Sequence, residues 1–128
     1  MTKQEQNIEI VKNFYEEVFN AHNNSIAVLD KYMRNDYSQH NGTVKDGKVG
    51  FIEFTNMFFK ADPKMEIKKI FANEDEVAVF FKCTCRANGS INKVVDIYRL
   101  ENGKLAEHWD VVEHDIEDII FPNGHGVF

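Results

Sequence analysis

Residues 94–113 read VVDIYRLENGKLAEHWDVVE, two β-prone runs on either side of the dipeptide Asn102-Gly103. Asn-Gly is favoured in two-residue hairpin turns because both of its residues tolerate positive φ. A second such dipeptide, Asn88-Gly89, lies upstream. The turns separate β-prone runs at nearly even spacing, and this predicts an antiparallel meander with strands at residues 76–87, 91–100 and 104–113, preceded by a further strand near 65–70.

The first half of the chain has helical periodicity instead. Thr2-Lys3-Gln4-Glu5 matches the capping box that begins many helices, and apolar residues then recur at helical spacing. Ser25 can cap a second, shorter helix. These signals predict three helices, over residues 3–21, 26–33 and 49–60, with an extended segment at 37–41. Helices followed by a curved meander indicate an α+β fold in which the helices cover one face of the sheet.

The composition limits the class of protein. The chain has 128 residues, of which 43% are hydrophobic, which suits one core, so residues 1–128 are expected to form a single domain. The net charge of -6, with basic residues dispersed among acids, argues against binding to nucleic acid or to an anionic membrane. No stretch approaches the ~18 apolar residues that a membrane span needs, and the N-terminus lacks a signal-peptide core, so a cytoplasmic protein is expected.

Cys83 and Cys85 are the only cysteines and lie two residues apart in an expected strand. We expect their side chains to point to opposite faces, which would keep the two sulfur atoms from joining. A C-x-C pair can contribute to a metal site, but there is no second cysteine pair, so two half-buried thiols are the favoured interpretation.

The last predicted strand places a histidine and an aspartate on one face. Side chains alternate along a strand, so His108 and Asp110 point the same way, while Glu107 and Trp109 point the other way. A partly buried pair of this kind suits general acid/base chemistry, because a carboxylate beside an imidazole can hold or deliver a proton near neutral pH. An exposed polar face is an equal interpretation, since antiparallel sheets often leave one face solvated.

Asp96 interrupts an apolar run in the preceding strand and therefore needs a partner. Pairing across the Asn102-Gly103 turn sets residues whose numbers sum to about 205 opposite one another, which brings Asp96 near His108 or Asp110. A slip of one residue would change which faces align. If the register holds, three titratable side chains converge.

Two motifs resemble a known family. Tyr37-Ser38-Gln39-His40-Asn41, followed by Asp46-Gly47, and the stretch from Asp96 to Val111 with its Glu107-His108-Trp109-Asp110 signature are similar to the SnoaL-like family of the nuclear transport factor 2-like superfamily. The resemblance covers most of the chain, in order. It implies a conical α+β barrel, in which N-terminal helices pack on a strongly curved, mainly antiparallel sheet, a ligand in the open mouth, and a homodimer formed through the outer sheet face.

The resemblance also implies a site. In the polyketide cyclases of this family, an aspartate of the last strand is the acid/base for an intramolecular aldol closure without metal or cofactor, and Asp110 matches it. Those cyclases have a histidine where this chain has Asp96, so isomerisation or hydrolysis of a small, largely apolar carbonyl compound is also expected, and a non-catalytic ligand-binding homodimer is the alternative. The expected catalytic residues are Asp110, His40 and His108, and the expected ligand-binding residues are Tyr37, Gln39, Asn41, Asp96 and Trp109.

Other interpretations of these residues remain open. The carboxylates and histidines between Glu107 and Asp115 include zinc and iron ligands, but their spacing matches no recognised motif, and an acidic solvent-facing surface explains them, so no metal is expected. Core packing alone accounts for Trp109 and for Tyr37. A hydrogen bond within its loop could explain His40, although a polar residue before a Gly-containing loop is typical of pockets.

Overall fold

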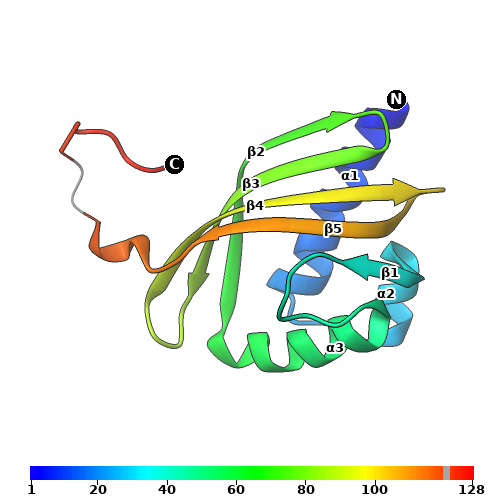
Figure 1. The fold of residues 1–128 in the computed structure, drawn as a ribbon, viewed down its shortest axis with the longest axis horizontal. Coiled ribbons are helices and arrows are strands. Elements are labelled where there is room, and N and C mark those ends of the chain that lie inside the picture. Colours follow the sequence, from blue (N-terminus) through cyan, green and yellow to red (C-terminus); the bar gives the residue numbers. More distant parts are fainter. Residues whose placement is uncertain (120–121) are drawn as a thin grey trace.

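The computed structural model describes residues 1–119 and 122–128, and in this part of the chain three α-helices pack on one face of a five-stranded sheet (Figure 1). This is the predicted α+β fold. The helices are α1 (Lys3–Phe14), α2 (Ile26–Tyr32) and α3 (Gly47–Phe58), with the shorter helical turns η1 (Tyr15–Asn20), η2 (Phe59–Ala61) and η3 (Ile116–Asp118). The strands are β1 (Met33–Gln39), β2 (Pro63–Asn73), β3 (Glu76–Cys85), β4 (Ser90–Glu101) and β5 (Lys104–Glu113).

The first helix begins as predicted and ends differently. Thr2 Oγ1 accepts a hydrogen bond from the Glu5 amide at 3.1 Å, and the Glu5 carboxylate accepts one from the Thr2 amide at 3.0 Å, which completes the capping box. The α-helix then ends at Phe14 and continues as the π-helix η1, so the predicted helix over residues 3–21 has two parts. A π-helical turn shifts the side chains after it around the helix axis, and such turns are frequent at functional sites.

Four strands form the predicted meander, and a fifth joins it from the first half of the chain. The strand order is β1-β5-β4-β3-β2, in which only β1 pairs in parallel. This pairing sets Gln39 opposite His108, and the His40 amide donates to the His108 carbonyl at 2.9 Å. The motif that ends β1 therefore lies beside the signature of β5, although about 70 residues separate the two in sequence.

The β4–β5 hairpin has the predicted turn and one irregularity. Leu100 pairs with Leu105 next to the turn, which agrees with the predicted sum of 205, but a bulge between Arg99 and Leu100 shifts the rest of the ladder by one residue. Asp96 consequently pairs with Asp110. A bulge places an extra residue in one strand and so changes which side chains share a row, and here it aligns the two aspartates on the inner face.

The core lies between the helices and the inner face of the sheet. Phe14 is fully buried and meets five other aromatic rings at centroid distances of 5.2–6.0 Å, those of Tyr15, Phe19, Tyr32, Phe51 and Tyr98. Edge-to-face contacts dominate, as the quadrupoles of aromatic rings favour. This aromatic layer forms part of the wall of the cavity described below.

The expectation that Cys83 and Cys85 face opposite sides of the sheet is wrong. Both are buried on the inner face of β3, because residues two apart on a strand share a face. They are free thiols. Burial, followed by the neighbouring Cys85, raises the pKa of Cys83 to about 12, so its thiol is uncharged at neutral pH.

The C-terminal tail partly covers the outer face of the sheet. Ile116 is buried, and the Phe128 ring lies 6.0 Å from that of Phe80, with the amines of Lys68 and Lys82 each 5.9 Å from its centroid. Ile119 and Phe128 remain 37% and 39% exposed.

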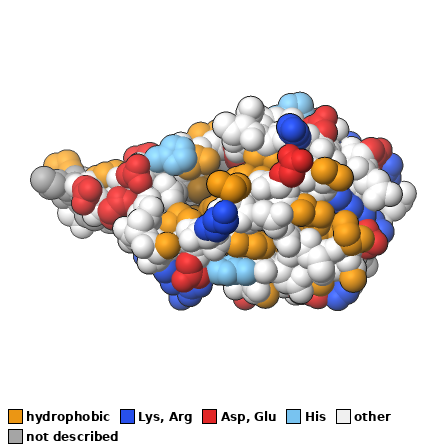
Figure 2. Space-filling view, turned by 90° about the horizontal axis from the view of Figure 1, so that it is seen from below, with side chains coloured by type: hydrophobic (Ala, Val, Ile, Leu, Met, Phe, Trp, Pro, Cys, Tyr) orange, Lys and Arg blue, Asp and Glu red, His pale blue; other side chains and the backbone are white. Residues whose placement is uncertain are grey.

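The face that carries α3 mixes hydrophobic and charged side chains at the surface (Figure 2). Val49 and Met57 of this helix are 70% and 66% exposed, while its buried residues include Phe51 and Thr55. Among the described residues, no helix is both long enough and apolar enough to cross a membrane.

Candidate functional site

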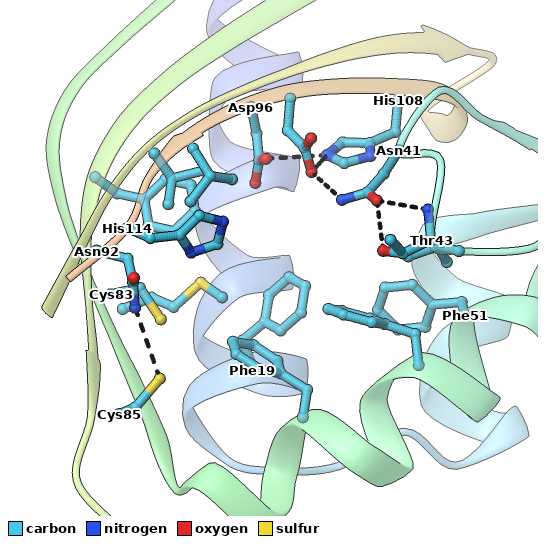
Figure 3. Close-up of a pocket in the computed structure, with 18 of the residues that line it drawn as sticks. Phe19, Asn41, Thr43, Phe51, Cys83, Cys85, Asn92, Asp96, His108 and His114 are labelled. Carbon is cyan, nitrogen blue, oxygen red and sulfur yellow. Dashed lines mark hydrogen bonds and ion pairs between the residues drawn. The ribbon is translucent and has the colours of Figure 1, made fainter. Parts of the chain in front are cut away.

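A cavity of about 670 Å³ lies between α3, η1 and the inner face of the sheet (Figure 3). Most of its wall is apolar, and five phenylalanines contribute to it: Phe19, Phe51, Phe54, Phe58 and Phe81. A group of polar side chains from β1, β4 and β5 lies at one end. Cavities of this size with a few convergent polar groups are typical of small-molecule sites.

His108 is at the centre of the polar group. It is 7% exposed, and its Nε2 lies 2.9 Å from Asp96 Oδ1 and 3.8 Å from Asp110 Oδ2. Two carboxylates that face each other across a strand pair repel when both are ionised. The imidazole between them provides the proton or positive charge that makes this arrangement stable.

Two phenols hold Asp96 from its other side. Tyr15, the first residue of η1, and Tyr98 both donate to Asp96 Oδ2, the latter at 3.1 Å. Burial, and then the nearby Asp96 carboxylate, raises the pKa of Tyr15 and of Tyr98 well above the usual value for tyrosine, so both phenols stay protonated and act as donors. The sequence analysis did not identify these two residues as part of the site. The available signal was a tyrosine hydroxyl on the core side of a predicted helix, for Tyr15, and of a predicted strand, for Tyr98.

The other nitrogen of the His108 ring contacts Gln39. The Gln39 amide oxygen accepts from the Asn41 backbone N–H at 3.2 Å, and this fixes it as an acceptor. His108 Nδ1, which bonds the same oxygen, must then carry a proton. His108 Nε2 and Asp96 consequently share one further proton, and its position sets whether the pair is ionic or neutral.

Asp110 is the carboxylate that meets the cavity. Its Oδ2 accepts from the Asn41 side-chain amide at 2.8 Å, and its side chain is 16% exposed. Its other oxygen has no hydrogen-bond partner within residues 1–119 and 122–128. Asn41 itself is fixed by its loop, since its Oδ1 accepts from the Thr43 amide and hydroxyl at 3.0 and 2.7 Å.

Tyr37 also lines the cavity and is 2% exposed. Its ring lies parallel to that of His108 at a centroid distance of 6.4 Å. Burial, followed by the charge of Asp96, raises the pKa of Tyr37 well above its usual value, so this phenol remains a hydrogen-bond donor. The structure therefore brings together Tyr37, Gln39, Asn41, Asp96, His108 and Asp110.

The expectation that His40 and Trp109 belong to this pocket is wrong. Neither is part of the cavity wall; their rings stack on each other at 4.8 Å with an interplanar angle of 1°. His40 Nε2 lies 2.7 Å from Glu107 Oε2, and the His40 side chain is 46% exposed. The two-residue period of a strand accounts for this, because Gln39 ends β1 on the inner side of the sheet and the next residue, His40, points to the outer side.

The polar group contains three side chains of types that bind metal ions. Ligand atoms of Asp96, His108 and Asp110 all lie within 4.8 Å of one another, which is close enough for one ion. However, His108 Nε2 and Asp96 Oδ1 are at hydrogen-bond distance, and an ion bound to Nε2 would have to displace the proton between them. Without an ion, the hydrogen bonds of His108 with Asp96 and of Asn41 with Asp110 account for the positions of the three side chains.

Solved structures with the same fold carry several descriptions. A candidate polyketide cyclase from Acidithiobacillus ferrooxidans superposes with a TM-score of 0.72 at 18% identity, over 88% of this chain and 92% of its own. An NTF2-like protein of unknown function from Mesorhizobium loti gives 0.70 at 18% identity, over 88% and 95%. AclR, a candidate hydroxylase from Streptomyces galilaeus, gives 0.68 at 19% identity, over 86% and 80%. At these identities the likeness shows the fold alone.

The family model settles the relationship more closely. Comparison of the sequence with curated proteins gives no match. Residues 9–114 match the model of the SnoaL-like polyketide cyclases, a range that includes every polar residue of the cavity end described above. The chain therefore belongs to the SnoaL-like polyketide cyclase family.

Proposed function

We propose that the protein, acting as one domain, is a cofactor-independent acid/base enzyme whose substrate is a small, largely apolar carbonyl compound. One observation carries this proposal: Asp110 lines an apolar cavity, Asn41 donates to one of its carboxylate oxygens at 2.8 Å, and the other oxygen has no hydrogen-bond partner among the described residues. A base with one anchored and one open oxygen is positioned to remove a proton from a bound molecule.

The proposed reaction begins with the carbon next to a carbonyl group. Asp110 takes a proton from that carbon, and negative charge develops on the carbonyl oxygen of the resulting enolate. The Tyr37 phenol, which remains protonated, is the donor proposed to stabilise this oxygen. In an aldol closure the enolate carbon attacks a second carbonyl of the same molecule, and the alkoxide so formed takes the proton back from Asp110. In an isomerisation the proton returns to another carbon.

His108 and Asp96 tune the base in this scheme. The proton between His108 Nε2 and Asp96 Oδ1 sets the charge of the imidazole, and this charge acts through space on the Asp110 carboxylate, whose Oδ2 lies 3.8 Å from Nε2. Tyr15 and Tyr98 stabilise negative charge on Asp96 when it forms. In this scheme Asp96 stands where the polyketide cyclases have a histidine. Its carboxylate needs the His108 imidazole as a hydrogen-bond partner.

Deuterium exchange tests the base directly. The acidic C–H groups of 2-tetralone are followed by NMR in D₂O with and without protein. We expect Asp110→Asn to lower catalysed exchange by roughly 10²–10⁴-fold. The matched control is Glu113→Gln, which removes the same charge from a half-exposed side chain on the same strand, and it should exchange like the wild type. Equal exchange by wild type and Asp110→Asn would contradict the acid/base role.

A non-catalytic binding module is the second candidate function. It is favoured by the fact that Asp96 and His108 satisfy their hydrogen bonds within the protein and that aromatic rings make up much of the cavity wall. In this case a ligand that copurifies with the protein would be recovered unchanged after long incubation. Detection of a product by mass spectrometry would reject this function.

We further propose that two copies associate through the outer face of the sheet. Strand pairing places Phe71, Ala78, Ile97 and Trp109 in one row of that face, and Phe80, Val95 and Val111 in the next. Phe71 and Val111 are 64% and 73% exposed. Apolar rows of this extent favour burial against a second apolar surface, and an identical copy offers the same rows.

A further inference from the structure

A second polar row, made of Asn92 of β4 and His114, the residue directly after the end of β5, is left unused by the proposed reaction. Val94 pairs with Val112, two residues along from the Asp96–Asp110 pair. Two residues further along, Asn92 and His114 also line the cavity. The sheet side of the cavity is therefore polar at the Asp110 end, apolar in the middle, and polar again at the far end.

The two polar rows are far enough apart to bind opposite ends of one molecule. Four residues separate Asp110 from His114, which corresponds to about 13 Å along a strand. Figure 3 shows His114 and Asn92 on the opposite side of the cavity from Asn41 and Thr43, with the Phe19 and Phe51 rings beneath the space between them. An elongated apolar body fits this arrangement.

The far row has hydrogen-bonding capacity left for a ligand. The His114 imidazole has no hydrogen-bond partner in the described part of the chain. Asn92 Oδ1 accepts from the Asp115 amide at 3.1 Å, and its NH₂ group donates one hydrogen to the Cys85 sulfur at 3.8 Å, which leaves its second hydrogen without a partner among the described residues. One donor and one imidazole that can donate or accept therefore face the cavity.

The charges around this row favour an uncharged group. The Asp115 carboxylate accepts from the Ser90 hydroxyl at 2.7 Å, and the Glu117 carboxylate accepts from the Ile91 amide at 2.9 Å, so two acids are fixed at the rim. A ligand carboxylate here would meet like charge. The Cys83 thiol, in the same row of the sheet as Asn92, is uncharged.

We propose that His114 and Asn92 form a specificity subsite that binds a neutral hydroxyl or carbonyl group at the far end of an elongated, apolar substrate. The inference rests on the proposed function in one respect, namely that the reacting carbonyl lies at Asp110. It narrows the substrate class to molecules with polar groups at both ends of an apolar body. His114 and Asn92 then select the substrate and keep its carbonyl end at the base.

Three matched ketones test the subsite by binding alone. 2-Acetylnaphthalene, 6-acetyl-2-naphthol and 6-acetyl-2-naphthoic acid share one body and one carbonyl and differ only at the far end. For the wild type, measured by isothermal titration calorimetry, we expect the naphthol to bind about 10-fold more tightly than 2-acetylnaphthalene. The naphthoic acid should bind more weakly than either.

Substitutions at His114 and Asn92 test whether these two residues cause the preference for the naphthol. His114→Leu and Asn92→Leu should each reduce the naphthol preference, and the double variant should abolish it. Asp110→Asn lies at the other end and should change the affinity for all three ketones while keeping their ratio. Circular dichroism checks that each variant is folded, and Asn92→Asp, which keeps the shape of the side chain, provides a second variant that should also lose the preference.

Several results would overturn the subsite. One is that the wild type binds the naphthol and 2-acetylnaphthalene with equal affinity, and another is that it binds none of the three ketones. The subsite would also be excluded if the naphthol preference survived in the double variant, or if Asp110→Asn abolished it instead. The 2-tetralone experiment measures proton removal by Asp110 and does not use these ligands. The subsite can therefore fail while the acid/base role stands, and the acid/base role can fail while the binding preference stands.

Discussion

Tyr15 contributes to the candidate site although it lies in the hydrophobic core. It is 1% exposed, and its hydroxyl donates to Asp96, which is itself 5% exposed. A buried carboxylate that loses a donor retains the cost of desolvation without the compensating hydrogen bond. Tyr15 and Tyr98 therefore stabilise the folded protein and the charge of Asp96 through the same contacts.

Replacement of Tyr15 measures this contribution. We expect Tyr15→Phe to lower the free energy of unfolding by about 1–3 kcal/mol in urea denaturation, because it leaves Asp96 with one donor fewer and changes little in ring packing. Tyr32→Phe is the control, since the Tyr32 hydroxyl contacts the partly exposed Glu17 carboxylate, which water can solvate in its place. A loss in Tyr15→Phe no larger than that in Tyr32→Phe would show that Asp96 does not depend on the phenol.

Glu107 provides a test on the outer side of the same strand. The hydrogen bond from His40, followed by that from Arg99, lowers the pKa of Glu107 below its ordinary value of 4.5. A group whose pKa is lower in the folded state stabilises the protein above its unfolded-state pKa, and this stabilisation is lost as the pH falls through the folded-state pKa.

The wild type should accordingly be more stable than Glu107→Gln near neutral pH, and the difference should shrink as the pH is lowered from about 6 to about 3. Chemical denaturation at a series of pH values measures both proteins under the same conditions. Other acidic groups titrate in both, so the difference isolates Glu107. A difference that is independent of pH, or that grows in acid, would contradict the assigned contacts.

Among the elements, the loop between β1 and α3 positions Asn41. Asp46 Oδ1 accepts from the Gln39 amide at 2.7 Å, which closes the loop, and α3 packs directly beneath it. Gly50 makes this packing possible, because a Cβ atom at this position would lie 2.0 Å from the Lys45 carbonyl oxygen. The neighbouring atom is backbone, so no side-chain rotation can relieve the contact.

Gly50→Ala should therefore displace the loop. We expect a loss of about 1–3 kcal/mol in stability despite the better helix propensity of alanine, together with slower exchange of 2-tetralone because Asn41 no longer holds Asp110. Gly42→Ala is the matched control within the same loop, since a Cβ there meets nothing within 4 Å. If Gly50→Ala were as stable and as active as Gly42→Ala, the loop would not depend on this close approach.

The helices and strands also show which parts of the fold and of the candidate site can be predicted from the sequence. Local signals located the three α-helices and the four meander strands of the described residues: the capping box of α1, the Ser25 cap, whose hydroxyl accepts from the Val28 amide at 3.3 Å, and the two Asn-Gly turns. Period-two alternation put His108 and Asp110 on one face, and the cavity lies on that face. These features depend on residues close together in the chain.

Apart from the orientation of Cys83 and Cys85, which was a local error in applying the two-residue period of a strand, the features that the sequence did not specify arise where distant segments meet. The position of His40 depends on the parallel pairing of β1 with β5, and no pattern within residues 37–41 specifies this partner. The pairing of Asp96 with Asp110 depends on a one-residue bulge that the Asn102-Gly103 turn does not reveal. Tyr15 reaches Asp96 across 81 residues of sequence, so the helical stripe alone indicated only core packing.

At the scale of the whole molecule, the two proposed functions, ligand chemistry and dimer formation, use opposite faces of the sheet. The inner face holds the polar rows and the cavity, and the outer face holds apolar rows that the tail residue Phe128 covers only beside Phe80. His40 and Trp109, which do not line the cavity, stack on the outer side of β5. The half-buried Trp109 belongs to the first apolar row of the surface proposed for a second copy, and the exposed His40 ring that stacks on it borders this row.

Val111 tests whether this outer face forms a dimer. It is 73% exposed and lies within the apolar rows, so Val111→Lys would bury an unpaired charge in the proposed interface and should weaken association by at least about 100-fold. Size-exclusion chromatography with light scattering should give a dimer for the wild type and a monomer for the variant. Val49→Lys makes the same change at a residue of α3 that is 70% exposed, and it should remain dimeric. Two results would place the interface elsewhere: a monomeric wild type, or a dimer that Val49→Lys disrupts and Val111→Lys does not. The reason is that only the outer-face arrangement buries Val111 away from water.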